Sequence, residues 1–289
     1  MTELSINQKK FIRSLHRKKI RNETGLFLVE GDKMVRELLH TPSGENAAGE
    51  IHFGIRTLVA TVEWLEEFGA GLPGGIEILS AKAEDLRQIA SQQEPNKAIA
   101  IAEKADYQLD IPRLKKQLVL GLENIQDPGN LGAIIRIADW FGIRDVLCSG
   151  ECVELYNPKV IQSTMGSFLR VRVHYLDIAG LLSQIRGGKS PNTEDIRDEV
   201  RGTGKSAAWN SYPVLGTGSQ GDNLYESILP TRGMILLGNE SRGLSESLMR
   251  LSDSILSIPR HDPGMHPESL NVASAAAVIC AEFRRQAHI

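Results

Sequence analysis

The sequence has few cysteines, and their scarcity excludes two ways of stabilising a fold. Only Cys148, Cys152 and Cys280 occur in 289 residues, and an odd number does not make a complete disulfide framework. Cys148 and Cys152 stand four positions apart with no second pair, so the spacing of a zinc site is missing and we expect no metal. Reduced thiols of this kind are typical of a cytosolic protein.

A long apolar run is also lacking. No window approaches the roughly 18 continuous apolar residues that a membrane-spanning helix needs. The opening MTELSINQKKFIRSLHRKK contains no apolar core of a signal peptide. With 41% hydrophobic and 24% charged residues, the composition is that of a globular protein. We therefore expect a cytoplasmic protein of one large domain or two ordinary ones.

The chain has no surplus of positive charge. Its formal net charge of -3 argues against a uniformly basic coat for nucleic acid, but a local patch remains open. Residues 9–21 carry seven Lys or Arg, while Phe11, Ile12 and Leu15 have the helical spacing of a buried stripe. A solvated helix face and an RNA-binding surface both explain this pattern. The candidate RNA contacts are Lys9, Lys10, Arg13, Arg17, Lys18, Lys19 and Arg21.

Alternating strand and helix patterns predict two α/β domains. A strand at 26–30, a periodic helix after it and a strand near 55–60 indicate a first domain over residues 1–105. The polar segment 106–117 contains a proline and is the predicted linker.

The second predicted domain covers residues 118–289 and begins with a βαβ pattern. Apolar strands at 118–122 and 145–148 flank a helix at 131–141, which is typical of a parallel sheet. Within this domain, residues 187–211 are rich in Gly, Ser and charge, and predict a mobile insertion.

Two further strands predict where the chemistry lies. The apolar runs 234–237 and 255–258 each end in a polar, turn-forming loop, and a small-residue helix begins near Asn271. Because α/β proteins place their sites at the carboxyl ends of strands, we expect a site at 238–243 and 258–271.

A glycine-rich segment at 216–221 matches the pattern G-x-G-x-x-G. A dinucleotide site also requires a helix that opens at the third glycine, and only a few helical positions follow before Pro230. The segment therefore favours a flexible loop over a nicotinamide or flavin site.

Three polar residues stand in positions that stability alone explains poorly. Asn130 follows a strand and is placed to cap the next helix. Arg136 lies among apolar helical neighbours, either as a snorkelling side chain or as a guanidinium held for an anion or hydroxyl. Glu240 at a strand end needs solvent or a hydrogen bond, and this favours a functional role.

Three segments together resemble a known family. DPGNLGAIIRIADWFG, LLGNESRGLS and SLNVASAAAVICAEF, in this order, resemble the three motifs of the SpoU/TrmH-like RNA ribose 2′-O-methyltransferases of the SPOUT superfamily. The resemblance covers about residues 117–286. FIRSLHRKKIRNETGLFLVEGDKMVREL resembles the substrate-binding domain of this family, which is similar to a ribosomal-protein RNA-binding fold.

The resemblance implies an α/β fold, a cofactor and a reaction. The fold is a parallel-sheet domain with a C-terminal trefoil knot, paired as a homodimer. S-adenosylmethionine is expected to be bound by backbone groups of Gly238, Ile258 and Leu270, and the substrate is a structured RNA, rRNA or tRNA. Arg136 is expected to stabilise the developing alkoxide of a ribose 2′-hydroxyl. The other residues that match family positions are Asn130, Glu240, Ser269 and Asn271.

Departures from the family pattern leave alternatives open. The loop 260–267 is longer than is common, and Gln162 to Gly166 stand where many members have Arg and Ser. A non-catalytic RNA-binding or ribosome-assembly factor on the same fold is one alternative. A nucleotide-dependent oxidoreductase that uses residues 216–221 is another.

Overall fold

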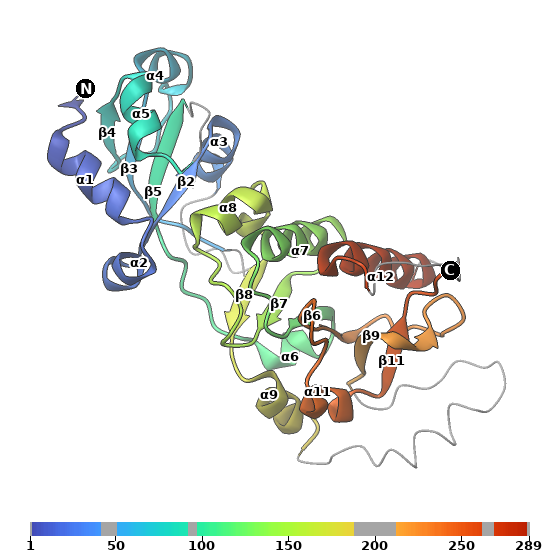
Figure 1. Cartoon of the computed structure of the whole chain (residues 1–289). Helices are drawn as coiled ribbons and strands as arrows, with labels where there is room; N and C mark the ends of the chain where they lie inside the picture. Colours follow the sequence, from blue (N-terminus) through green and yellow to red (C-terminus); the bar gives the residue numbers. More distant parts are fainter. Residues whose placement is uncertain (1, 42–50, 92–96, 188–211, 262–268, 288–289) are drawn as a thin grey trace. The chain divides into compact units, whose positions relative to one another are not determined.

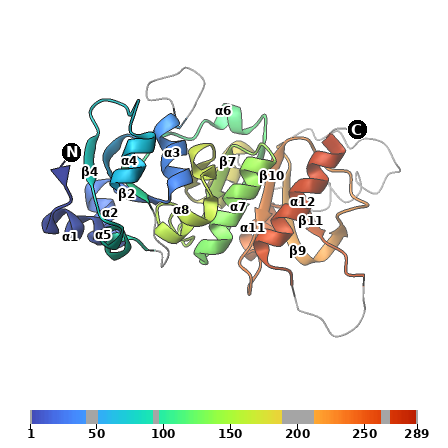
Figure 2. The ribbon, with the colours of Figure 1, turned by 90° about the horizontal axis from the view of Figure 1, so that it is seen from above.

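The computed structural model describes residues 2–41, 51–91, 97–187, 212–261 and 269–287. These residues form two compact units, shown in two views in Figures 1 and 2. Unit 1 comprises Met1–Tyr107 and Glu154–Arg170, and unit 2 comprises Gln108–Val153 and Val171–Ile289.

Unit 1 is built on a mixed sheet of five strands. Their order is β1-β4-β3-β5-β2, with β1, β4 and β3 parallel and β5 antiparallel to β3 and β2. The strands are β1 (Thr2–Glu3), β2 (Leu26–Glu30), β3 (Ile55–Ala60), β4 (Glu77–Ser80) and β5 (Ala98–Glu103). The helices in the first segment of unit 1, Met1–Tyr107, are α1 (Ile6–Ser14), α2 (Lys18–Thr24), α3 (Asp32–His40), α4 (Val62–Phe68) and α5 (Ala83–Ile89).

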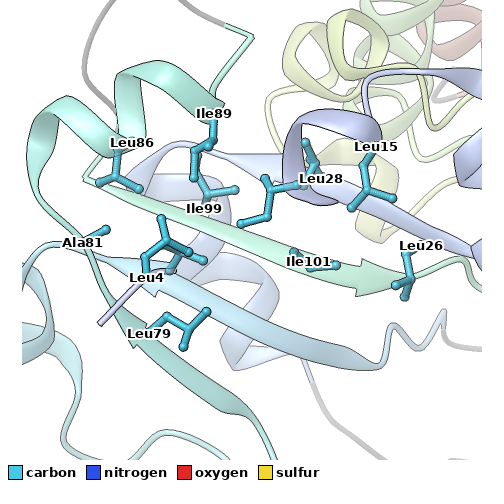
Figure 3. Packing of buried hydrophobic residues seen from close by; sticks show 12 residues of the cluster. Leu4, Leu15, Leu26, Leu28, Leu79, Ala81, Leu86, Ile89, Ile99 and Ile101 are labelled. Atoms are coloured by element: carbon cyan, nitrogen blue, oxygen red, sulfur yellow. The ribbon is translucent and has the colours of Figure 1, made fainter. Parts of the chain in front are cut away.

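Side chains of β2 alternate between the two faces of this sheet and fill two cores. On one face, Leu28 packs with Ile99 and Ile101 of β5 and with Leu86 and Ile89 of α5 (Figure 3). On the other face, the ring of Phe27 lies 6.0 Å from that of Phe168 and 4.6 Å from that of Tyr156. Burial on both faces explains why the strand sequence is almost continuously apolar.

The basic N-terminal segment forms two helices instead of one. Ser5 caps α1 through a capping box with Gln8, and the chain breaks between α1 and α2. Ile12 and Leu15 are buried as expected, but Phe11 is 41% exposed, so its predicted place in the buried stripe is wrong.

The segment 154–170 packs in unit 1 although it falls in the middle of the second predicted domain. It contains α8 (Pro158–Thr164) and the short helix η1 (Ser167–Leu169). Its Phe168 belongs to the aromatic core described above, and its Leu155 is also buried. The division into independently folding domains at 1–105 and 118–289 stays a prediction.

Unit 2 is built on a fully parallel sheet of six strands, as the sequence predicts. Their order is β11-β9-β10-β6-β7-β8. The strands are β6 (Leu118–Leu122), β7 (Asp145–Cys148), β8 (Arg172–Tyr175), β9 (Val214–Asn223), β10 (Gly233–Leu237) and β11 (Ser254–Ser257). The helices are α6 (Ile111–Leu114), α7 (Pro128–Trp140), α9 (Ile178–Ile185), α11 (Glu246–Leu251) and α12 (Val272–Ala287).

Helices cover both faces of this sheet. In Figure 1, α7 and α12 lie on one side of the strands, and α6, α9 and α11 lie on the other. Figure 2 shows α7 and α12 overlying the strands from above. The guanidinium of Arg284 ties the two helices by donating to the carbonyl of Phe141 at 2.7 Å. The central strands β6 and β10 are buried throughout, as expected for a parallel sheet.

The glycine-rich segment 216–221 is part of strand β9, so the predicted flexible loop is wrong. Gly216 pairs with Leu236 on one side and with Ile255 on the other. A Cβ atom on Gly216 would lie 2.5 Å from the Ile255 side chain, which explains the glycine by close packing. The segment therefore does not form the strand-to-helix turn of a dinucleotide site.

Several further expectations meet the structure only in part. The predicted linker 106–117 contains the helix α6. The predicted insertion, apart from residue 187, and residues 262–267 of the longer loop lie outside the described residues. In the described part of the chain, no helix has the length and apolar character to cross a membrane, and no group of His, Cys, Asp or Glu is placed to hold a metal ion. The trefoil knot stays a prediction.

Candidate active site

Three polar side chains from distant parts of unit 2 meet at the carboxyl edge of its sheet. Nδ2 of Asn130 donates to Oε1 of Glu240 at 2.5 Å, and Nδ2 of Asn271 donates to Oδ1 of Asn130 at 2.8 Å. Asn130 begins α7 after β6, Glu240 follows β10, and Asn271 precedes α12. The structure thus brings together three of the residues predicted as catalytic.

Helix capping sets the positions of both asparagines. Oδ1 of Asp127 accepts from the backbone N–H of Asn130 at 2.8 Å and caps α7, with Pro128 at its first position. The predicted cap by Asn130 is therefore wrong, because the helix begins two residues earlier. Oδ1 of Asn271 accepts from the backbone N–H groups of Ala273 at 3.0 Å and Ser274 at 3.3 Å. Capping occupies the Asn271 carbonyl, so its amide N–H is left to reach Asn130.

Asn239 fixes the loop that carries Glu240. Its Oδ1 accepts from the backbone N–H groups of Ser241 at 3.0 Å and Arg242 at 3.2 Å. Its Nδ2 donates to the carbonyl of Asn124 at 2.9 Å, and Asn124 has a left-handed backbone with φ 56. One side chain therefore closes its own loop and joins it to the loop after β6.

Glu123 makes a second link between these two loops. Its backbone N–H donates to the carbonyl of Leu237 at 2.9 Å, and its Oε2 accepts from the backbone N–H of Ser245 at 2.6 Å. Sequence reasoning missed Glu123, Asn124 and Asn239. Their only sequence signal is that each lies in a polar loop directly after a buried strand.

Gly238 occupies a position that excludes any side chain. A Cβ atom there would lie 2.2 Å from the backbone carbon of Gly243, and the two ends of the loop are joined by a bridge between Asn239 and Gly243. Backbone packing therefore explains this glycine. Its predicted contact with the cofactor stays a prediction.

The remaining predicted site residues stand on α7, after β11 and before α12. Ile258 follows β11 and is half-buried, while Ser269 and Leu270 directly precede Asn271 and are exposed. Arg136 is exposed on α7, six positions after Asn130. At about 100° per residue, Arg136 lies on a different face of the helix from Asn130, and it shares its own face with Trp140, which is 85% exposed.

A thiol supports the loop after β6 from inside the protein. Sγ of Cys152 accepts from the backbone N–H of Ile125 at 3.2 Å and lies 3.4 Å from the carbonyl oxygen of Leu122. A hydrogen bond from Cys148 lowers the pKa of Cys152 to about 7, and that from Ile125 acts in the same direction. Cys148 and Cys152 are buried, and all three cysteines are free.

The predicted RNA contacts in unit 1 divide into exposed and internally paired residues. The side chains of Lys10, Arg13, Arg17, Lys18 and Lys19 are exposed. Lys9 is partly buried and forms an ion pair with Asp85 at 2.5 Å.

Arg21 needs a correction, because its side chain faces the interior of unit 1. It is 2% exposed, and its guanidinium donates to the carbonyls of Leu15 and His16 at 2.8 Å and pairs with Glu154. A buried, fully engaged guanidinium holds the structure together and is not available to RNA.

The fold and the site define a class of protein. A parallel α/β sheet presents one carboxylate and two amides, held by three loops at the carboxyl ends of its strands, where such proteins bind ligands. The chain belongs to the SpoU rRNA Methylase family, whose model matches residues 117–281. Residues 7–100 match the MRM3-like substrate binding domain.

Individual relatives agree with this family. The chain is 28% identical over 284 residues to the 23S rRNA (guanosine(2553)-2'-O)-methyltransferase RlmP of Bacillus subtilis, covering 98% of each chain. A solved structure from Porphyromonas gingivalis, described as a TrmH-family protein, is 33% identical with a TM-score of 0.77, covering 99% of this chain and 100% of that one. The SpoU methyltransferase AviRb of Streptomyces viridochromogenes, solved with AdoMet, is 23% identical with a TM-score of 0.76, covering 98% and 99%, and shares the fold. The predicted family and α/β fold are confirmed.

Proposed function

We propose that this protein transfers a methyl group from S-adenosylmethionine to a ribose 2′-hydroxyl of ribosomal RNA. The observation that carries the proposal is the hydrogen-bonded meeting of Asn130, Glu240 and Asn271, one residue from each of the three family motifs. Membership of the SpoU family and the name of the Bacillus subtilis relative support rRNA as the substrate. A transfer RNA remains the alternative substrate of the same reaction.

The loops around this cluster suit S-adenosylmethionine. Leu270 is 56% exposed and Ile258 is half-buried, so both offer apolar surface beside polar groups, as an adenosine requires. Gly238 stands where the backbone leaves no room for a side chain. We propose that backbone groups of these three residues hold the cofactor, as AviRb was solved with AdoMet.

The proposed roles of the chain's own residues concern the position of the ribose and the charge on its 2′-oxygen. When bound, S-adenosylmethionine supplies an electrophilic methyl group, so the protein has to align the 2′-hydroxyl and stabilise the charge that develops on its oxygen. Arg136 is the proposed donor to that oxygen, since a guanidinium remains protonated. Glu240, Asn130 and Asn271 hold the loops, and Ser269 lies beside them.

We further propose that two copies of the chain form the working enzyme. Arg136 lies on an exposed face of α7 together with Trp140, away from Asn130 on its own helix. A second copy packed on this face would shield Trp140. The same packing would place Arg136 where the two chains meet, so that it can act at the site of its own chain or of the partner chain. We also propose that the enzyme works in the cytosol, because its three cysteines are free.

Substitution of Arg136 tests the reaction directly. Arg136→Ala is expected to lower methyl transfer to unmodified 23S rRNA at least about 100-fold, as loss of one charge-stabilising donor does. Affinity for S-adenosylmethionine, measured by calorimetry, should be unchanged. Arg144→Ala is the matched control, because Arg144 is exposed and pairs only loosely with Asp139 at 3.6 Å.

Two results would count against the proposal. Full activity of Arg136→Ala would remove Arg136 from the mechanism. Failure of the wild-type protein to bind S-adenosylmethionine, or to protect any rRNA ribose from alkaline cleavage, would remove the function. Mapping the protected riboses in rRNA from a deletion strain with and without the restored gene would identify the nucleotide.

A further inference from the structure

Lys104, at the end of β5, has a side chain that is held in place above α2. Its Nζ donates to Oδ1 of Asn22 at 2.8 Å and lies 5.3 Å from the centre of the Tyr156 ring. Its backbone N–H donates to the carbonyl of Gly25 at 2.8 Å, just after α2 ends. The side chain of Lys104 is thus fixed by a neutral oxygen and a ring, and its ammonium has no carboxylate as a hydrogen-bond partner among the described residues.

The charges around Lys104 do not balance. Burial is the main reason that the pKa of Lys104 is lowered; Glu154 opposes this shift, and the nearby cations Arg21 and Lys18 add to it. The Glu154 carboxylate is already bound to the buried Arg21. Lys104 and Lys18 therefore form a local excess of positive charge, which an external anion would relieve.

We propose that Lys104 and Lys18, with the adjacent Arg17, bind the phosphate backbone of the RNA substrate. These three residues are called the α2 surface. That its ligand is RNA rests on the proposed function. Lysine binds phosphate as a point charge without reading a base, so the surface contributes affinity and orientation instead of sequence choice. The α2 surface adds Lys104 to the predicted RNA contacts of the basic segment and leaves out the buried Arg21.

The α2 surface combines parts of the chain that sequence matching keeps separate. Lys104 lies beyond residues 7–100, which match the substrate binding domain. Tyr156 and Glu154, which support Lys104 and hold Arg21, lie within the SpoU match 117–281. Because residues 154–170 pack in unit 1, the methylase part of the sequence helps to shape the RNA-binding surface of the other part.

The salt dependence of RNA binding tests this assignment. Each phosphate contact releases counterions, so Lys104→Gln should reduce the slope of log K against log salt by about 1, and lower affinity for unmodified 23S rRNA at low salt. Lys82→Gln is the matched control. The register pairs Ala60 with both Ser80 and Ala98, which places exposed Lys82 at the edge of the sheet opposite the end of β5.

A second variant tests the charge without altering Lys104. Asn22→Asp places a carboxylate at the atom that Lys104 contacts. The carboxylate should offset the ammonium charge and reduce the slope of log K against log salt to a similar extent. Unfolding by urea checks that both variants remain folded. A slope in Lys104→Gln equal to that of wild type, or an equal loss in Lys82→Gln, would overturn the proposal.

The outcomes separate this site from the reaction. If wild-type protein methylates rRNA and Lys104→Gln keeps the full slope, the α2 surface is wrong while the function stands. If wild-type protein binds rRNA with a slope that depends on Lys104 but transfers no methyl group, the surface stands and the proposed reaction is wrong.

Discussion

Asn130 has opposite hydrogen-bonding roles at its two side-chain atoms, donating to Glu240 and accepting from Asn271. An aspartate would present a carboxylate to Glu240, and two adjacent carboxylates raise the pKa of one of them. We expect Asn130→Asp to bind S-adenosylmethionine at least about 10-fold more weakly at neutral pH, or about 1.4 kcal/mol. Affinity measured by calorimetry should recover as the pH falls, because a proton shared between the two carboxylates removes their repulsion.

Asn130→Ala separates this charge effect from simple loss of the side chain. Asn130→Ala removes both hydrogen bonds and introduces no acid, so its affinity should be low at every pH. If the two variants show the same pH dependence, Glu240 does not sense position 130, and the hydrogen-bonded cluster does not control the cofactor site.

The sequence predicts the members of this cluster better than their supports. Asn130, Glu240 and Asn271 lie in motifs whose residue types and order are visible in the sequence. Asn239 and Glu123 bond to backbone groups, and those bonds exist only because the loops fold as they do, including the left-handed turn at Asn124. Residue type alone does not reveal such a contact.

At the scale of elements, the segment 154–170 is joined to α2 by a buried ion pair. Arg21 and Glu154 are 133 positions apart, so the charge run at 9–21 gave no sign that one of its members had an internal partner. Arg21→Met should lower the free energy of unfolding by about 3 to 5 kcal/mol, because it leaves a buried carboxylate unpaired. Urea unfolding measures this.

Arg17→Met is the control for that prediction. Arg17 is exposed and adjacent to α2, so its replacement should change stability by no more than about 0.5 kcal/mol. Equal losses in the two variants would show that Arg21 stabilises only as a surface charge.

Residues 154–170 also limit what a deletion can test. Removal of residues 1–105 would uncover the buried Phe168, so this deletion is unsuitable as a test of RNA binding alone.

At the scale of the whole molecule, the class of sheet follows from the sequence, but the order of its strands does not. Continuous apolar runs followed by helices predict parallel strands buried on both faces. The order β11-β9-β10-β6-β7-β8 depends on which crossover passes which strand, and local patterns contain no information about this. Gly216 suggested flexibility because the Ile255 side chain, with which a Cβ atom at this position would collide, comes from another strand.

The proposed pairing of two chains is tested at Trp140. Trp140 is 85% exposed, and tryptophan is one of the side chains enriched among interface anchors. Trp140→Asp should shift the protein towards monomer in sedimentation equilibrium by at least about 10-fold in dissociation constant, equivalent to about 1.4 kcal/mol. Methyl transfer should fall at low protein concentration and recover as concentration rises.

Met249→Asp provides the comparison, because Met249 is 44% exposed on α11, on the other side of the sheet from α7. It should leave both the assembly and the reaction unchanged. If Trp140→Asp keeps the wild-type dissociation constant, the α7 face is not the contact. If a monomeric variant remains fully active, the reaction does not need the pairing. Arg136 would then have to act within its own chain, and the loops that hold Glu240 would have to move towards it.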